Sequence, residues 1–599
     1  MGTVCGWIGV ETGDARETIG AMLGNDGGQQ HGTVSAGLAA AESSGPASLD
    51  TGGDAWTAIE GNPRWRDREL ADIARDAGFA RSLAVAYQRL GADLLGQLEG
   101  SFALCILEPA SGHALLAVDR VGFRPLAYAP LGDGLVFGSR LDNIVAHPAG
   151  EWSISPQGIF DYLYFHMIPS PGTIYTGIRK LQPGEFVELR DRRLNTGFFR
   201  PLAFSEARRP RRELEQQLRD ELERAVRNCL DERRSGTFLS GGLDSSTVTG
   251  VLQSLSGKPV DAFAIGFQAE GFDEMAYARA TARHFGVDLH EYYVTPADVL
   301  DAIPRVTAAY DEPFGNASAI PAYYCAKFAR ENGIELLLAG DGGDEIFAGN
   351  SRYAKQKLFD LYGRVPAPLK KGLIEPLAFG LPPLRKLKSY IEQARIPMPA
   401  RMETYNFLHR SPLEEIFNPA FLSRVDPQAP LRELEATYAR GRTDSLVKKM
   451  LFLDHKITLA DNDLRKVNRM CELAGVGVCY PLLQDGMFEF AATVPSDMLL
   501  RGFELRSFFR RAMGDFLAPE TLRKSKHGFG LPFGLWLRED PELRAFADAS
   551  LEQIRQREIL NLDYIDNIIR EQRQGHATYF GVMIWILVML EQWLQSRGL

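Results

Sequence analysis

An unusual set of small and charged residues directly follows a short apolar run in the middle of the chain. In TFLSGGLDSSTV the run ends at Leu239, and the segment SGGLDSS occupies residues 240–246. Its glycines permit positive φ, so consecutive backbone N–H groups can point into one concavity, and a helix beginning near Asp244 would add partial positive charge. With the serine hydroxyls as further donors, the segment predicts a loop that binds phosphate.

Asp244 does not fit a phosphate loop by itself, because a carboxylate repels a phosphate unless a divalent cation lies between them. The segment is not a Walker A loop, since the pattern GxxxxGK[ST] does not occur here. The alternative interpretation is a strand-to-helix turn that is capped by Asp and Ser side chains and binds no ligand.

A second turn of the same character follows another apolar run. ELLLAGDGGDEIFAGN, residues 335–350, carries Asp341, Asp344 and Glu345 among its glycines. Ligands of parallel α/β sheets bind at the carboxyl ends of strands, so the two turns would lie side by side if both runs belong to one sheet. Asp244 and Asp344 could then hold Mg²⁺ on the phosphates of a nucleotide. The alternative is a solvated acidic turn.

The elements that would position these turns fall into two predicted units. Up to about residue 204, short apolar runs such as CGWIGV and SFALCILE alternate with turn residues, which predicts an α+β domain with antiparallel sheets. SEARRPRRE, residues 205–213, is a polar and basic linker that leads into a helix. Beyond it, apolar strands alternate with helices, which predicts a parallel α/β sheet, and from about Arg352 the pattern is mostly helical.

Composition narrows the classes of function. The chain has 599 residues, a net charge of −10 and six cysteines without a CxxC pair, so we predict neither a zinc ribbon nor a disulfide framework. The acidic balance argues against a non-specific nucleic-acid binder. GVMIWILVML, residues 581–590, is too short to span a bilayer and is expected to form a buried helix. We therefore expect no nucleic-acid or membrane partner and a reducing, cytoplasmic setting.

FLSGGLDSS resembles the PP-loop of the asparagine synthetase family, which is part of the ATP pyrophosphatases. These enzymes cleave ATP between the α- and β-phosphates and adenylate a carboxylate. The similarity covers nearly the whole chain and continues in order through FAIGF (263–267), DEPFGNASAIPAYY (311–324), LLAGDGGDEIFAG (337–349) and KSKHGFGLPFGLWL (524–537). Upstream, LEGSFALCILE, LLAVDRVGFRPLAY and PSPGTIYTGIRKLQPGE resemble that family's N-terminal glutaminase domain.

The resemblance implies two domains and two cofactors. Residues 1–204 would form an Ntn-hydrolase-like glutamine amidotransferase domain with stacked antiparallel sheets. Residues 205–599 would form an α/β PP-loop ATP-pyrophosphatase domain with a mostly helical C-terminal part. ATP and Mg²⁺ would be the cofactors, and a homodimer is possible because relatives often dimerise.

The same resemblance implies a nucleotide site made of many residues. Pyrophosphate and Mg²⁺ would be held by Ser240, Gly241, Gly242, Asp244, Ser245 and Ser246, with Asp344 sharing the metal. The adenosine would be bordered by Leu239 and Ile265, and backbone groups would be offered to the nucleotide by Ala339 and Gly340.

Two further residues would take part in the chemistry. Asp341 stands where many relatives carry a glutamate that is linked to forming the acyl-adenylate, and it is one methylene shorter. Lys526 matches a lysine whose ammonium would offset charge on the phosphates and on the oxyanion formed as an amine attacks. Taken alone, Lys526 would be interpreted as a surface lysine.

The predicted glutaminase domain departs from the family at its nucleophile. In glutamine-hydrolysing relatives a cysteine follows the initiator methionine, and its own free amine assists the thiol. Here Met-Gly-Thr-Val precedes Cys5, so removal of methionine would expose Gly2. A buried strand residue is therefore the alternative to a nucleophile at Cys5. Translation from a GTG codon at position 4 would restore an N-terminal cysteine, and the intact mass of the native protein would test that hypothesis.

Polar residues that hold glutamine in the family are also missing. GGQQHGT (27–33) replaces an Arg-Gly-Pro-Asp stretch, and AIEGNPRW (58–65) replaces Asn-Gly-Glu-Ile-Tyr-Asn. AGFARSLAVAYQRLG (77–91) contains no acid to bind the α-amine of glutamine, a loss that should cost about 2–5 kcal/mol of binding. We expect a retained fold with weak or absent glutaminase activity.

The synthetase half departs near the predicted acceptor pocket. LRKVNRMCELAGVGVCYPLLQD (464–485) keeps the family's Arg469, Pro481 and Asp485. Gly477 and Cys479 stand where asparagine-making relatives place glutamate and arginine, which suggests a larger or less polar substrate.

The expected function is ATP-dependent, AMP-forming amide ligation, which adenylates a small-molecule or peptide carboxylate before an amine attacks. The sequence does not decide which amine attacks. The first hypothesis is ammonia, either free or supplied by a residual glutaminase. The second is an amine on the substrate itself or on a second molecule. The second case resembles relatives that close β-lactams or lasso peptides. A non-catalytic nucleotide-binding regulator is a rival of a different class.

Overall fold

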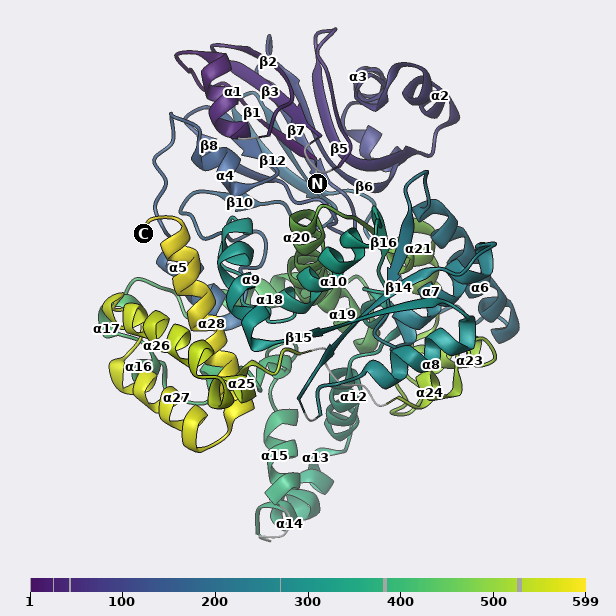
Figure 1. Ribbon diagram of the computed structural model, residues 1–599, viewed down its shortest axis with the longest axis vertical. Helices are drawn as coiled ribbons and strands as arrows, with labels where there is room; N and C mark the ends of the chain where they lie inside the picture. Colours follow the sequence, from purple (N-terminus) through teal and green to yellow (C-terminus); the bar gives the residue numbers. More distant parts are fainter. Residues whose placement is uncertain (1, 25, 43–44, 270, 381–384, 525–529) are drawn as a thin grey trace.

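The computed structural model describes residues 2–599 apart from positions 25, 43–44, 270, 381–384 and 525–529. Two antiparallel sheets come first along the chain, and a parallel sheet surrounded by helices follows (Figure 1). This order confirms the fold class predicted from the alternation of strands, turns and helices.

The N-terminal part consists of two six-stranded antiparallel sheets that share a core. Val4 of one sheet and Ala58 and Cys105 of the other belong to the same buried cluster, so the sheets are stacked face to face. The first sheet has the order β10 (Arg179–Lys180), β8 (Ala127–Leu131), β9 (Gly134–Gly138), β1 (Thr3–Ile8), β3 (Ala36–Ala41), β2 (Gln29–Thr33). The second has the order β12 (Arg193–Phe198), β11 (Glu185–Arg190), β7 (His113–Val118), β6 (Leu98–Glu108), β5 (Trp56–Trp65), β4 (Ala47–Asp50).

Five helices accompany these sheets. They begin at capping residues such as Asp14 and Ser155, whose side chains accept backbone N–H groups of the first turn. Their bounds are α1 (Ala15–Leu23), α2 (Arg68–Ala77), α3 (Phe79–Leu90), α4 (Leu141–Val145) and α5 (Pro156–Phe165).

The apolar runs predicted as parallel strands form a five-stranded parallel sheet, in which the short strand with Thr237 is central. Its order is β15 (Asp288–Val294), β14 (Asp261–Phe267), β13 (Ser235–Phe238), β16 (Leu336–Leu338), β17 (Gly477–Cys479). The surrounding helices are α6 (Arg211–Cys229), α7 (Leu243–Leu255), α8 (Met275–Phe285), α9 (Pro296–Ala309), α10 (Ala319–Glu331) and α11 (Gly343–Phe347). Figure 1 shows α7 and α8 on one side of the strands and α9 and α10 on the other.

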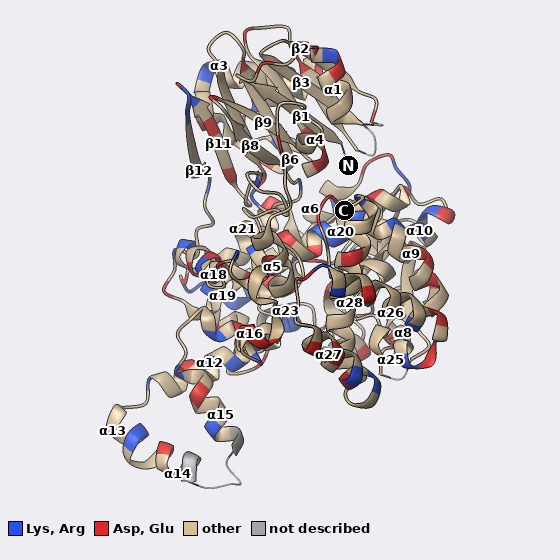
Figure 2. Ribbon diagram, turned by 90° about the vertical axis from the view of Figure 1, so that its left-hand side faces the viewer, with Lys and Arg blue, Asp and Glu red and all other residues tan. Residues whose placement is uncertain are grey.

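Four short or medium helices then form an arm that projects from the body, away from the N-terminal sheets (Figures 1 and 2). They are α12 (Ser351–Gly363), α13 (Ala367–Leu369), α14 (Glu375–Gly380) and α15 (Arg385–Ala394), with the π-helical turn η2 (Lys370–Ile374) joining α13 to α14. Phe359 and Ile391 form the arm's small interior.

The remaining helices complete the body. They are α16 (Leu413–Ile416), α17 (Pro419–Leu422), α18 (Ala429–Arg440), α19 (Leu446–Asp454), α20 (Arg465–Ala474), α21 (Asp485–Thr493), α22 (Ser496–Leu499), α23 (Ser507–Ala512), α24 (Pro519–Arg523), α25 (Phe533–Glu539), α26 (Pro541–Gln556), α27 (Leu562–Gln574) and α28 (Ala577–Ser596). A π-helix, η6 (His455–Leu464), connects α19 to α20.

The apolar run at residues 581–590 lies in α28, which packs against the body as predicted. The helix has 20 residues, so by length and composition it passes the test for a membrane span that the shorter run fails. However, 72% of its apolar window is buried inside the protein. Burial rather than length therefore supports the interpretation of α28 as a core helix.

Candidate nucleotide and carboxylate site

The two predicted loops lie side by side at the carboxyl end of the parallel sheet, because they leave the adjacent strands β13 and β16. A Cβ built on Gly340 would lie 2.6 Å from the backbone nitrogen of Ser245, so glycine is required at this approach. Gly241 has a φ of +69°, and its Cβ would lie 2.4 Å from the carbonyl carbon of Tyr277. Close backbone contacts therefore explain glycines in both loops.

Serine side chains close the first loop on itself at the N-terminus of α7. Ser245 Oγ accepts the backbone N–H of Ser240 at 3.2 Å and lies 3.0 Å from Ser240 Oγ. Lys524 donates to the carbonyl oxygen of Ser240 at 2.9 Å and pairs with Glu274 at the same distance. An ammonium group thus lies beside the loop, while Lys526, predicted for that role, lies outside the described residues.

The aspartates of the two loops converge on one guanidinium. Arg506 Nη2 lies 2.7 Å from Asp244 Oδ2 and 2.5 Å from Asp344 Oδ1, and Nη1 makes a further short contact with Asp244 Oδ1. Burial acts to lower the pKa of Arg506, but the charges of Asp244 and Asp344 outweigh burial and raise it. Asp244 and Asp344, which were predicted to share a magnesium ion, therefore share the guanidinium of Arg506 in this structure.

The carboxylates fit the predicted magnesium ion. A Cβ on Gly343 would lie 2.1 Å from Asp244 Oδ1, and one on Gly349 would lie 1.8 Å from Asp344 Oδ1, so glycines make the space for both oxygens. Mg²⁺ is usually bound by one or two carboxylates together with substrate phosphates. No group of three metal-ligating side chains occurs among the described residues, so the nucleotide would supply the remaining ligands.

A cavity of about 310 Å³ opens against the two loops. Its lining combines apolar side chains, including Phe238, Phe263 and Pro321, with the polar and acidic residues of the two loops, a mixture that suits a nucleotide with an apolar base and charged phosphates. The predicted residues that line it are Leu239, Ser240, Gly242, Asp244, Ser245, Ile265, Gly340, Asp341 and Asp344.

Three other predicted residues shape the loops instead of lining the cavity in the described part of the chain. Ser246 is fully buried, and its hydroxyl forms a hydrogen bond with Thr281 at 2.9 Å. Ala339 is fully buried, and its N–H donates to the carbonyl of Cys479. Gly241 packs against Tyr277, as described above.

The end of the cavity beyond the phosphate loops is built from charged groups. Burial raises the pKa of Asp341 to about 6, and the nearby Lys466 opposes that rise. Lys466 pairs with Asp463 at 2.7 Å; burial acts to lower its pKa, but Asp463 and Asp341 raise it overall. This end therefore holds an ammonium near a carboxylate whose pKa is raised to about 6.

The structure places Cys5 in the interior of a sheet. It lies within β1, opposite Ala39 of β3 and Gly138 of β9, and its side chain is fully buried. Burial, with a smaller contribution from Asp26, raises the pKa of its thiol to about 12. Only the thiolate is an effective nucleophile, so this environment suits a structural cysteine.

The residues that precede Cys5 are part of the same sheet. Thr3 and Val4 are fully buried, and the N–H of Val4 donates to Ser139 Oγ at 3.0 Å. The peptide nitrogen of Cys5 therefore lies inside a strand in this structure.

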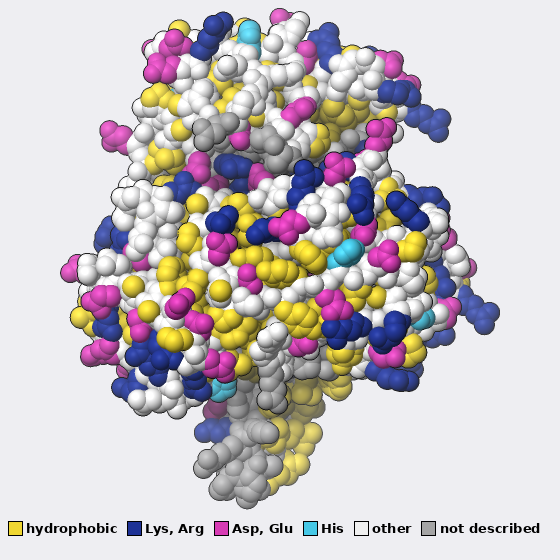
Figure 3. All heavy atoms as spheres, viewed as in Figure 1, with side chains coloured by type: hydrophobic (Ala, Val, Ile, Leu, Met, Phe, Trp, Pro, Cys, Tyr) yellow, Lys and Arg dark blue, Asp and Glu magenta, His cyan; other side chains and the backbone are white. Residues whose placement is uncertain are grey.

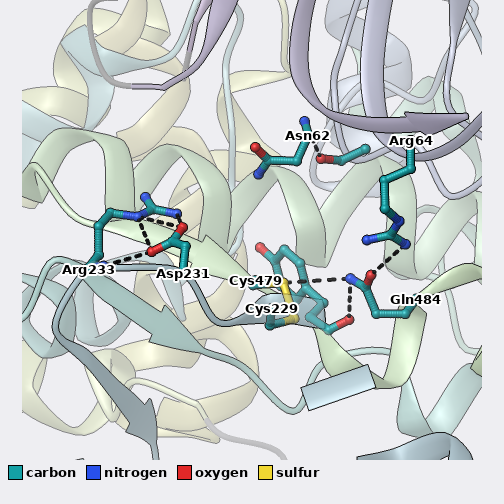
Figure 4. Close-up of a disulfide and its surroundings, with 9 residues drawn as sticks. Asn62, Arg64, Cys229, Asp231, Arg233, Cys479 and Gln484 are labelled. Atoms are coloured by element: carbon teal, nitrogen blue, oxygen red, sulfur yellow. Dashed lines mark hydrogen bonds and ion pairs between the residues drawn. A yellow bond between two sulfur atoms is a disulfide. The ribbon is translucent and has the colours of Figure 1, made fainter. Parts of the chain in front are cut away.

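A disulfide joins Cys229 at the end of α6 to Cys479 of β17, 250 residues apart, with a Cα–Cα distance of 5.7 Å (Figure 4). The sequence suggested no disulfide framework, and its spacing did not indicate this single bridge. Cys479 is thus not an open position in the predicted acceptor pocket, and neither is Gly477, whose Cβ would lie 2.5 Å from Nη1 of Arg233. Among the described residues, neither lines the cavity.

Asp485, one of the residues that the resemblance places near the acceptor pocket, lies at the contact with the N-terminal sheets. Asp485 accepts the backbone N–H of Gly100 at 2.7 Å and lies 3.5 Å from Arg120. Arg469 pairs with Glu472 at 2.7 Å. The charged side chains that line the cavity beyond the loops, Asp463 and Lys466, were not predicted.

Arg506 was also missed, because no local signal marks it. It lies 262 residues from Asp244, inside ELRSFFRR, which reads as an ordinary amphipathic helix start. Lys466 carried a weak signal, since it follows Asp463 by three residues, the spacing of a helical ion pair.

Stacked antiparallel sheets followed by a parallel sheet with a glycine- and acid-lined cavity are the arrangement expected of an ATP-using amide ligase joined to an amidotransferase-type domain. Residues 217–595 match the family model described as asparagine synthase, and residues 75–199 match that of the glutamine amidotransferase domain. The chain belongs to the asparagine synthase family and is an ATP-dependent carbon–nitrogen ligase.

Named relatives agree with this assignment. Asparagine synthetase (glutamine-hydrolyzing) 1 of Bacillus subtilis (strain 168) is 24% identical over 527 residues, which cover 85% of this chain and 81% of the relative. A putative asparagine synthetase (glutamine-hydrolyzing) of Mycobacterium tuberculosis (strain ATCC 25618 / H37Rv) is 23% identical over 557 residues, or 90% of this chain and 83% of the relative.

Among solved structures, NMN synthetase from Francisella tularensis is similar with 13% sequence identity and a TM-score of 0.20, covering 43% of this chain and 97% of that one. At this score the likeness carries no argument about the present chain.

Proposed function

We propose that this ligase adenylates a carboxylate in the cavity next to Asp244 and Asp344, and that it joins the product to an amine that its N-terminal domain does not release from glutamine. The convergence of the two aspartates at adjoining strand ends supports the first half. The buried thiol of Cys5 supports the second half.

In the first step, a carboxylate oxygen attacks the α-phosphorus of ATP, the bond between the α- and β-phosphates breaks, and pyrophosphate leaves. The loop at residues 240–245 and the N-terminus of α7 would hold pyrophosphate with backbone N–H and hydroxyl donors. Mg²⁺ held by Asp244 and Asp344 would neutralise the phosphate charge when bound. Arg506 would keep these two carboxylates aligned.

In the second step, an amine nitrogen attacks the carbonyl carbon of the acyl-adenylate, the bond to AMP breaks, and the nitrogen loses a proton. Asp341, with a pKa of about 6, is ionised at neutral pH and would accept that proton. Lys466 would offset negative charge at the same end of the cavity. Lys526 keeps its predicted role as a second cation beside the phosphates. The cytoplasmic setting and the homodimer also remain predictions.

The test is a pyrophosphate-release assay with a panel of carboxylates, each offered ammonium, glutamine or an amine-bearing substrate. The wild type and Cys5→Ala should release pyrophosphate equally with ammonium or amine, and glutamine should not replace them. Lys526→Ala should slow release by about 10²-fold or more, because a cation beside developing charge is removed.

The outcomes separate this proposal from its rivals. Glutamine-dependent release that Cys5→Ala abolishes would establish a working glutaminase and reject the second half of the proposal. Absence of release with any carboxylate, in a protein that still binds ATP, would favour a nucleotide-binding regulator. An intact mass that begins at Cys5 would show that the native chain carries the free amine after all.

A further inference from the structure

A second cavity, of about 370 Å³, lies where the N-terminal sheets meet the helical body, and we call it the junction cavity. Its lining includes the end of β12 and the residues that follow it, together with parts of α18, α19, η6 and α21. In Figure 2, α18 and α19 lie directly below β12. Among the described residues, the junction cavity shares no lining residue with the nucleotide cavity. A ligand held here would therefore be different from the carboxylate that the ligase activates.

Every Lys, Arg, Asp or Glu side chain that lines the junction cavity in the described part of the chain is basic. These side chains are Arg120, Arg200, Arg440, Arg442 and Lys456. On the face of the molecule drawn in Figure 3, by contrast, acidic and basic side chains are interspersed. Glu489 pairs with Arg120 at 2.7 Å and with Arg200 at 2.5 Å, and Glu433 pairs with Lys456 at 3.0 Å. The other two cations form no ion pair among the described residues, so their charge remains for a ligand.

Arg440, the last residue of α18, is the better placed of these two cations. Its Nη2 donates to Gln182 Oε1 at 2.6 Å, and its guanidinium lies 4.3 Å from the centroid of the Phe198 ring. Both partners are uncharged. Burial lowers the pKa of Arg440, and the more distant carboxylates, Glu433 first, do not make up for it. A guanidinium in this state suits an anion, and a carboxylate can meet it with two parallel hydrogen bonds.

Four aromatic rings share the junction cavity with these cations. They belong to Phe198, Phe199, Phe452 and Phe488. Aromatic rings prefer offset or edge-to-face contact with a further ring, and sites for small molecules usually combine an apolar lining with a few placed polar groups. A bare inorganic anion would leave the phenylalanines in contact with water. The lining therefore fits an anion that has a flat apolar body.

His455 adds one unsatisfied polar atom to the lining. It is 6% exposed, its ring centroid lies 4.9 Å from that of Phe488, and its Nε2 is buried without a hydrogen-bond partner among the described residues. Burial lowers its pKa to about 4, and the charges of Arg120 and Arg440 act in the same direction, so the imidazole is neutral at pH 7. Buried polar atoms normally have a partner. A ligand hydroxyl would supply one for either tautomer, because a hydroxyl both donates and accepts.

We propose that the junction cavity is a binding site for a small aromatic carboxylate that carries a hydroxyl group. The carboxylate would meet Arg440, the ring would lie among the phenylalanines, and the hydroxyl would reach Nε2 of His455. Phe198 belongs to the N-terminal part, whereas Arg440 and His455 belong to the helical body. A bound ligand would therefore bridge the two parts of the molecule.

The experiment is isothermal titration calorimetry of the full chain with 4-hydroxyphenylacetate as the probe. Two matched compounds isolate its groups: 4-hydroxyphenylacetamide lacks the charge, and phenylacetate lacks the hydroxyl. We expect saturable binding of the probe. The amide should bind about tenfold more weakly or worse, because charge-assisted hydrogen bonds to Arg440 are lost. Phenylacetate should bind about threefold more weakly or worse, because Nε2 of His455 again has no partner.

Three variants locate the bound probe. Arg440→Gln should weaken probe binding about tenfold or more and remove the preference over the amide. Arg432→Gln is the matched control, since it makes the same change on the same helix at an exposed side chain that pairs with Asp426 outside the cavity; it should leave binding unchanged. His455→Leu should bind the probe and phenylacetate equally. The thermal unfolding midpoint of each variant shows whether it is folded.

Absence of saturable probe binding, equal affinity for the probe and its amide, or equal losses in Arg440→Gln and Arg432→Gln would each overturn the proposal. So would complete displacement of the probe by ATP, because the probe would then occupy the nucleotide cavity. Pyrophosphate release does not enter this test. The junction-cavity proposal and the proposed function therefore stand or fall separately.

Discussion

Arg506 shows how a single residue can organise the site. Its guanidinium takes the place between Asp244 and Asp344 where a cation was predicted, and its side chain is almost completely removed from water. A buried charge is tolerated only when it is paired. The two carboxylates and the guanidinium therefore form one unit, and removing any one of them should change what the other two contribute to the free energy of unfolding.

Asp244→Asn should destabilise the protein because it removes one of the two carboxylates that pair with the buried Arg506 in the described part of the chain. Breaking a buried ion pair by removing one partner costs about 3–5 kcal/mol, and the remaining carboxylate should keep the loss near the lower end. Urea unfolding of Asp244→Asn, Arg506→Met and the double variant measures this coupling. The double variant should be more stable than Asp244→Asn; additive losses would show that the two residues do not form one unit.

Asp341→Asn should stabilise the protein in a pH-dependent way. The folded pKa of Asp341, about 6, lies above its ordinary value of 3.8. The unfolded chain therefore ionises first as pH rises, and stability is lost between about pH 4 and 6. Asn removes that penalty, so at pH 8 the variant should be more stable by about 1–3 kcal/mol.

The difference between Asp341→Asn and the wild type should become small below about pH 3, where the wild-type carboxyl is largely protonated in both the folded and the unfolded state. Urea unfolding at the two pH values provides the measurement. An equal difference at both pH values would show that the gain does not come from ionisation of Asp341.

At the scale of elements, the phosphate loop depends on two close backbone contacts that only glycine allows, Gly241 against Tyr277 and Gly340 against Ser245. Gly241 has positive φ and no room for a Cβ next to Tyr277, whereas Gly257, after α7, has nothing within 4 Å of its Cβ position. Gly241→Ala should therefore distort the loop, cost about 1–3 kcal/mol and slow pyrophosphate release by about tenfold or more. Gly257→Ala is the matched control and should keep both the stability and the rate of pyrophosphate release of the wild type. Equal effects of Gly241→Ala and Gly257→Ala would exclude a special role for the loop backbone.

The loops were predictable because their signals are local. An apolar strand, glycines and the start of a helix within about a dozen residues specify a strand–loop–helix unit by themselves, and a parallel sheet brings two such units to one edge. The cavity's far end was not predictable in the same way. Lys466 reaches the far end, and Arg506 reaches the aspartates of the two loops, from segments that only tertiary packing brings near, so their sequence context resembles that of ordinary helical residues.

At the scale of the whole molecule, the disulfide between Cys229 and Cys479 ties α6 to the edge strand of the parallel sheet across 250 residues. Spacing along the chain gave no hint of this pairing, because both cysteines stand alone in their segments. Figure 4 shows that the bridge lies near the contact with the N-terminal sheets, where Arg64 of β5 donates to Gln484 at 3.3 Å. The closure of so long a loop should stabilise the folded chain by about 2–5 kcal/mol.

Thiol counting tests the disulfide directly. The denatured, unreduced protein should show four reactive thiols, those of Cys5, Cys105, Cys325 and Cys471, and the reduced protein should show all six. Cys229→Ser should free the thiol of Cys479 and raise the number of reactive thiols in the unreduced protein from four to five. Six thiols before reduction would show that the bridge does not form in the native protein.

The central claim is that the convergent aspartates at the strand ends serve AMP-forming activation of a carboxylate. The most direct measurement is ³¹P NMR of the products formed from ATP, Mg²⁺, an amine and a carboxylate panel by the wild type and by Asp344→Asn. The account predicts AMP and pyrophosphate from the wild type and about 10²-fold slower formation by Asp344→Asn. Formation of ADP and inorganic phosphate, or an undiminished rate in Asp344→Asn, would contradict it.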